Sequence, residues 1–263
     1  MIEVAVSVQF EALPGFGVVD FGLLWERWRD RFPDTQYQPP LAPVVEIFGG
    51  RRTRSDEIRL EPFLPIGRCW YRSASRDRLL QVQPDRLVLN WQQAGTDTPY
   101  PSYDALRSEF TQALGEFLDF AAERRLGEFE PTQCELIYVN HLLAGREWTR
   151  PGDLADVLVP LADPAPAGRG TLPDVEDLRA SWKYRFDDEA GAPLGRLYVE
   201  LYSAERGAGA QPVFVLQMTG RGAPRGADVA GVLAFTDRAH EWITHGFASL
   251  TTDRMHTLWE RQR

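Results

Sequence analysis

The chain has 263 residues, of which 43% are hydrophobic and 25% are charged, and its formal net charge is -9. These proportions are typical of a folded globular protein and exclude a disordered or low-complexity chain. The excess of negative charge repels phosphate backbones and anionic lipid headgroups, so nucleic acid is not the expected partner.

The first predicted elements are a strand, an aromatic helix and a loop region. Residues 2–10 alternate apolar and polar side chains, which is the pattern of a strand with one buried face. Asp20 is placed as the N-cap of an amphipathic helix that Pro33 ends, and a proline-rich stretch of loops and short strands is expected over residues 33–43.

The residues after this loop predict a short apolar run at 44–48 and an exposed basic cluster at 51–54, followed by a strand at 68–72. A hairpin is then predicted at residues 79–92, with Pro84 and Asp85 in its turn. The register that pairs Gln83 with Arg86 gives one purely apolar face, formed by Leu80, Val82, Leu87, Leu89 and Trp91.

The second half of the chain repeats the order of elements in the first. A long helix begins at Ser102 and ends at Gly127, and a final long helix is announced by Asp228. The elements between them are a strand at 134–142, a helix-like segment at 153–158, a Pro- and Gly-rich linker at 162–170, and strands at 178–186, 196–202 and 213–219.

This repetition predicts a pseudo-duplicated α+β protein. Residues 1–130 and 131–263 would each form a β-α-β(n)-α half, and the two halves would share one broad antiparallel sheet with the long helices packed on one face. Sequence identity between the halves is negligible, so the prediction depends on the order and period of the elements.

Three short motifs stand out, namely LLQVQPDRLVLNW at residues 79–91, YPSY at 100–103 and YVNH at 138–141. With them, most of the chain resembles a bacterial family of uncharacterised proteins of similar length that is distributed sporadically among genomes. This resemblance implies no activity. The sporadic distribution favours an accessory role.

The sequence shows no arrangement typical of an enzyme. No two histidines have the i, i+4 spacing of a helical metal site, and His240 and His245 are expected to be solvated. The chain lacks a nucleophile elbow, a phosphate loop of the Walker type and a dinucleotide-binding turn. The glycine-rich residues 220–226 are interpreted as a flexible connection, and an anion cradle is the alternative. We therefore predict a non-enzymatic protein without cofactor or metal.

The sheet face opposite the helices is the predicted binding surface, because Tyr, Arg, Gln and Asn side chains combine contact area with directional hydrogen bonds. An ordinary solvated face is the alternative. The predicted binding residues are Gln81, Gln83, Arg86, Asn90, Arg179, Lys183, Arg185, Tyr198, Tyr202 and Gln217.

The predicted function is binding of a protein partner, or self-association, through this open face or through a sheet edge. One alternative is a small-molecule pocket between helix and sheet, lined by Trp28, Phe110 or Trp242. A second alternative, a nucleic-acid-associated factor, depends only on the local alternation of Arg and Lys. No apolar run reaches the roughly 20 residues of a membrane span, and the first residues do not resemble a signal peptide, so a cytoplasmic protein without membrane contact is expected.

Overall fold

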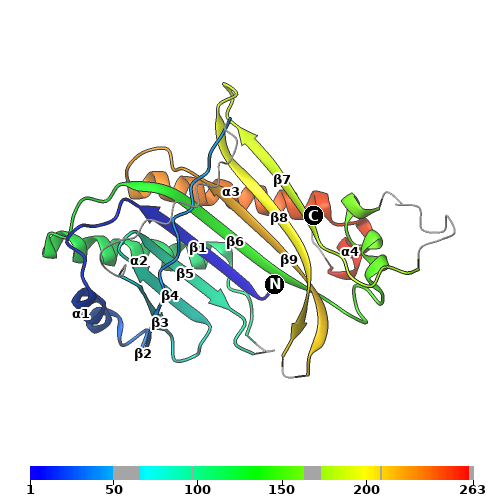
Figure 1. The fold of residues 1–263 in the computed structure, drawn as a ribbon, viewed down its shortest axis with the longest axis horizontal. Helices are drawn as coiled ribbons and strands as arrows, with labels where there is room; N and C mark the ends of the chain where they lie inside the picture. The colour runs from blue at the N-terminus through cyan, green and yellow to red at the C-terminus, as the bar shows by residue number, and fades with distance from the viewer. Residues whose placement is uncertain (50–65, 96–97, 163–172, 208, 261–263) are drawn as a thin grey trace.

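The computed structural model describes residues 1–49, 66–95, 98–162, 173–207 and 209–260. They form one nine-stranded antiparallel sheet in the order β2-β3-β4-β5-β1-β6-β9-β8-β7, with both long helices behind it in Figure 1. The predicted α+β class with a broad antiparallel sheet is confirmed. The predicted basic cluster at 51–54 and nearly all of the linker at 162–170 lie outside the described residues.

The elements follow one another along the chain in the order that their labels give. They are β1 (Glu3–Phe10), α1 (Val18–Trp28), β2 (Asp34–Gln38), β3 (Arg68–Arg72), β4 (Arg78–Gln83), β5 (Arg86–Gln92), α2 (Tyr103–Arg124), β6 (Pro131–Leu143), the 3-10 helices η1 (Pro151–Asp156) and η2 (Val159–Leu161), β7 (Ala180–Asp187), β8 (Pro193–Arg206), β9 (Gln211–Gly222), α3 (Val229–Leu250) and α4 (Asp253–Leu258). No helix among the described residues is both long and apolar enough to cross a membrane.

The predicted hairpin forms in the predicted register. Gln83 pairs with Arg86, Leu80 with Leu89 and Val82 with Leu87 across β4 and β5. The apolar face of this hairpin is buried in the core. The central strand β1 then pairs with β5 on one side and with β6 on the other, so a single core runs beneath the whole sheet.

Helix α1 begins three residues earlier than predicted, because Gly17 and not Asp20 is its N-cap. The Asp20 carboxylate accepts a hydrogen bond from the Gly17 N–H at 2.7 Å, and it also pairs with Arg124 of α2. The sequence therefore indicated the capping carboxylate correctly but placed it at the wrong position. Ser102 and Asp228 cap α2 and α3 as predicted, accepting from the N–H groups of Ala105 and Gly231.

Helix α3 packs close against the sheet because glycines lie beneath its aromatic and small side chains. A Cβ at Gly220 would lie 2.7 Å from the Cβ of Ala239, and one at Gly195 would lie 2.9 Å from the ring of Trp242. Gly220 and Gly222 are therefore strand residues of β9 whose missing side chains admit the helix. The interpretation of residues 220–226 as one flexible connection is wrong for the first three of them.

Candidate functional site

The four predicted binding residues of the first half are not exposed. Gln81, Gln83, Arg86 and Asn90 are between 3% and 8% exposed. Gln81 accepts hydrogen bonds from Arg68 and from Trp70, and its amide nitrogen donates to Asn90 at 2.6 Å. The open face was expected to be bare here, and this expectation is wrong because side chains and a segment of chain cover it.

That segment is residues 39–49, here called the strap, which follows β2. In Figure 1 it rises across the front of the sheet, over β1 and β6, toward the β7–β8 end. Part of it was predicted as a loop and part as a short apolar run. It is instead an extended connection that lies across the strands outside the sheet ladder.

Three glutamine side chains of the sheet hold the backbone of the strap. Backbone N–H groups of the strap donate to Gln83 of β4, Gln9 of β1 and Gln133 of β6, at 2.9–3.0 Å. Gln83 also returns a hydrogen bond to the Leu41 carbonyl at 3.1 Å. The strand register places Gln83, Arg86, Gln9 and Gln133 side by side on four neighbouring strands, so these side chains form one row beneath the strap.

At the far end of the strap, the Glu46 carboxylate enters a basic cluster on β8 and β9. It pairs with Arg196 and accepts a hydrogen bond from the Tyr198 hydroxyl, and Arg221 lies 3.5 Å away. The Glu46 side chain is 2% exposed. Burial and the hydrogen bond to Glu46 raise the pKa of Tyr198, so its hydroxyl stays protonated and keeps its proton to donate.

The predicted residues of the second half are more exposed than those of the first. Arg179, Lys183 and Arg185 of the β7 region are exposed, whereas Tyr198, Tyr202 and Gln217 are half-buried. Lys183 lies over the Tyr198 ring at 5.2 Å, and Arg179 lies over the Tyr202 ring at 5.9 Å. Gln217 instead lines a hollow of about 220 Å³ together with Gln81, Arg86 and Asn90. The structure thus divides the predicted surface into a covered polar part and an exposed basic part.

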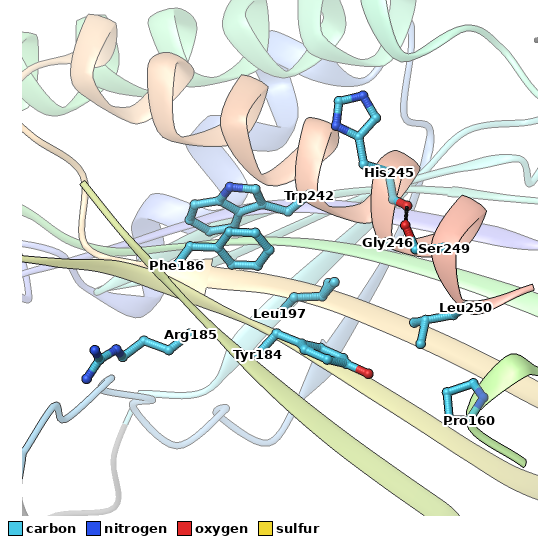
Figure 2. A pocket seen from close by; sticks show the side chains of 10 residues that line it. All are labelled: Pro160, Tyr184, Arg185, Phe186, Leu197, Trp242, His245, Gly246, Ser249 and Leu250. Atoms are coloured by element: carbon cyan, nitrogen blue, oxygen red, sulfur yellow. Dashed lines mark hydrogen bonds between the residues drawn. The ribbon is translucent and has the colours of Figure 1, made fainter. Parts of the chain in front are cut away.

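The opposite face of the same edge carries an apolar groove between β7, β8 and α3 (Figure 2). Its volume is about 590 Å³. Figure 2 shows the Phe186 ring of β7 beside Trp242 of α3 and Tyr184 further along β7 toward Pro160, whereas Arg185 points away from the groove. The lining residues are Pro160, Tyr184, Arg185, Phe186, Leu197, Trp242, His245, Gly246, Ser249 and Leu250.

Stacking of two aromatic rings forms one end of this groove. The Phe186 and Trp242 rings lie 4.3 Å apart at an interplanar angle of 9°. A Cβ at Gly195 would lie 2.9 Å from the six-membered ring of Trp242, so the missing side chain lets the indole pack directly on β8. Tyr184 remains 38% exposed at the lip. Trp28 and Phe110, which were also predicted as pocket residues, are solid core at 1% and 0% exposure.

Comparison with protein-family models, with curated proteins and with solved structures gives no match. The function is therefore inferred from the geometry of the described residues. The sequence did not predict that the strap covers the sheet. The alternation that places Gln9 and Gln83 on the open face was a usable signal of hydrogen-bonding groups there. Nothing local in the sequence indicated that Glu46 would reach residues 150 positions away.

A polar cluster between α2 and α3 corrects the prediction that His240 is solvated. The His240 Nδ1 lies 2.8 Å from the Tyr138 hydroxyl, and the His240 ring stacks on the Tyr103 ring with their centres 3.9 Å apart. The Tyr103 hydroxyl donates to Asp237, which also accepts from Arg107. The cluster therefore joins the two long helices to each other and to β6.

This environment predicts a pH dependence of stability. Burial lowers the pKa of His240 despite the opposing effect of Asp104 and Asp237. Below about pH 6.5 the unfolded chain therefore binds the proton more readily than the folded chain, so stability falls as the pH is lowered through this range. We expect His240→Gln to remove part of this loss, less than about 1 kcal/mol because the ring is half-exposed.

Urea unfolding of the wild type and of His240→Gln at several pH values between 5.5 and 8 measures how much of the pH dependence of stability His240 causes. His141 also has a pKa lowered by burial, so His141→Gln is the matched control for the second buried histidine. Parallel stability–pH curves for the wild type and His240→Gln would contradict the assignment.

Proposed function

We propose that the protein is a non-enzymatic binding protein whose partner is another protein, engaged at the sheet edge formed by β7. The observation that carries the proposal is that the apolar groove of about 590 Å³ opens along this terminal strand. An apolar concavity beside an edge strand offers both a pocket for side chains and a strand that no other strand of the sheet covers.

The two faces of β7 support complementary roles in such an interface. Tyr184 and Phe186 face the groove, whereas Lys183 and Arg185 lie on the other face. Charged side chains on an edge strand discourage indiscriminate pairing with other strands. A partner that combines apolar side chains with acidic ones would match both faces.

We also propose that the chain is pseudo-duplicated, with residues 131–263 corresponding to residues 1–130. The strand order supports this proposal, because β1 is followed in the sheet by β5, β4 and β3, as β6 is by β9, β8 and β7. In the first half, α1 covers the outer strands, and its Trp28 packs on Tyr71 at 5.3 Å. In the second half, the segment between β6 and β7 forms only short 3-10 helices among the described residues, and the groove lies at the corresponding position.

The test of this function uses a change at the lip of the groove. We expect Tyr184→Asp to abolish capture of the partner from an extract of the native host, because it places a charge where apolar side chains dock, while stability changes by less than about 0.5 kcal/mol. Val19→Asp, at a residue that is 72% exposed on α1, is the matched control and should leave capture unchanged. Replacing Arg179, Lys183 and Arg185 together by Ala measures the contribution of the basic face.

Equal capture by the wild type and Tyr184→Asp would contradict a partner site at the groove. Capture that is lost only in the triple Ala variant would place the interface on the sheet face instead. Hydrogen exchange of residues 180–187 in the captured complex is the direct measurement, since their amides should slow when the partner is bound.

A small molecule is the second candidate for the same groove. The specific observation is that Trp242, one of the three predicted pocket residues, does line a concavity, whose volume lies within the roughly 300–1,000 Å³ of ligand sites. Native mass spectrometry of protein purified from its host separates the two candidates. An added mass of a few hundred daltons that Trp242→Ala removes would favour the ligand over the protein partner.

A further inference from the structure

Three arginines lie side by side at the far end of the strap. The strand register places Arg185 of β7 opposite Arg196 of β8, and Arg196 opposite Arg221 of β9. Like charges directly opposite one another destabilise a sheet unless anions lie between them. Asp187 pairs with Arg185 at 2.7 Å, Glu135 of β6 pairs with Arg221, and Glu46 of the strap pairs with Arg196 and lies 3.5 Å from Arg221.

The strap is anchored in this cluster by its carboxylate more than by apolar contacts. The Glu46 side chain is 2% exposed, whereas its neighbours Val45 and Ile47 are 59% and 53% exposed. Phe48 contributes one further contact, since the Arg196 guanidinium lies 4.3 Å from the centre of its ring. An extended segment with an acidic residue and an aromatic residue two positions later therefore matches the site.

The hydrogen bonds that hold the rest of the strap are made by its backbone and not by its side chains. Gln83, Gln9 and Gln133 accept hydrogen bonds from backbone N–H groups, and Arg86 donates to the Ala42 carbonyl at 3.1 Å. Any extended peptide backbone offers the same groups. The row of side chains beneath the strap thus recognises an extended chain, and the basic cluster recognises its acidic residue.

We propose that Arg196, Arg221 and Tyr198, with the row of Gln83, Arg86, Gln9 and Gln133, form a binding site for an extended acidic segment of a partner protein. The strap fills this site within the free chain and competes with the partner segment. The proposal is independent of the groove at β7, because it depends on different residues on the opposite face of the sheet.

The experiment uses the full chain and a fluorescent peptide of residues 39–49 as the probe, with fluorescence anisotropy as the readout. The Glu46→Ala chain lacks the internal anchor, so we expect it to bind the peptide at least about 10-fold more tightly than the wild type does. We expect the same chain to bind a peptide with Gln in place of Glu46 at least about 10-fold more weakly, because a hydrogen-bonded charge pair is lost. Adding Arg196→Gln and Arg221→Gln to the chain should weaken binding of the Glu peptide by a similar factor.

A second variant addresses the possibility that Glu46→Ala unfolds the chain. Val44→Pro removes the backbone N–H that donates to Gln9 but leaves the basic cluster intact. Circular dichroism shows which variants are folded. If a folded variant binds the Glu and Gln peptides equally, or if neither folded variant binds the Glu peptide, the proposal is overturned.

Sedimentation distinguishes a partner protein from a second copy of this chain. We expect the wild type and Glu46→Ala to sediment as the same species at equal concentration. A wild-type dimer that dissociates on Glu46→Ala would show that the acidic segment is the strap of a second copy, which would overturn the proposal of a separate partner.

Discussion

Trp28→Ala should lower the free energy of unfolding by about 3–5 kcal/mol, as do other large-to-small changes of buried aromatic residues. The indole is 1% exposed and packs edge-on against Tyr71 at 5.3 Å. Its N–H also donates to Glu116 of α2 at 2.7 Å, so the change removes a contact between α1 and α2 as well as core volume. Urea unfolding should show a lower midpoint with an unchanged slope.

Trp25→Ala on the same helix is the matched control for this prediction. Trp25 is only half-buried, and its N–H donates to the Pro33 carbonyl at 3.1 Å. We expect it to cost less than half as much as Trp28→Ala, because less apolar surface is removed from the core. Equal losses for the two tryptophans would contradict the packing of Trp28 in the core against Tyr71 of β3.

Gly220→Ala should destabilise the protein by about 1–3 kcal/mol, whereas Gly115→Ala should stabilise it by about 0.5–1 kcal/mol. The added methyl at Gly220 would lie 2.7 Å from the Cβ of Ala239 and 3.2 Å from its Cα, so the backbone of α3 must move. The methyl at Gly115 meets nothing within 4 Å in the middle of α2. The same Gly→Ala change is therefore expected to lower the stability at residue 220 and to raise it at residue 115.

Thermal or urea unfolding of the two glycine variants under one buffer condition measures both effects. The control is internal, because each variant adds the same methyl group to the same chain. An unchanged or higher stability of Gly220→Ala would contradict the close approach of α3 to β9.

Periodicity predicted the regular elements because each depends on its own neighbours in the sequence. Ser102 and Asp228 cap helices where predicted, and Gln83 pairs with Arg86 across the turn. The edge strand β2 lies in the stretch where loops and short strands were expected, but its bounds were not predicted. Its five residues lie beside Pro33, and its pairing depends on β3, a strand 30 residues further along the chain.

The candidate sites were less predictable, since each joins residues that are far apart in the sequence. The alternation of β4 and β5 correctly aimed Gln81 and Asn90 at the open face, but it gave no sign that this face would be covered. The groove depends on the contact between Gly195 of β8 and Trp242 of α3. These residues lie far apart in the sequence, so no local pattern predicts the contact.

The span of the strap has a consequence for the order of folding. Glu46 meets Arg196 across 150 positions and Arg221 across 175 positions of sequence, so these ion pairs form only after β8 and β9 have paired. Contacts at such separation close large loops and are made late. During synthesis from the N-terminus, the contacts of Leu41 with Gln83 and of Val44 with Gln9 lie within the first half and can form early. The Glu46 end of the strap docks only after β8 and β9 have left the ribosome.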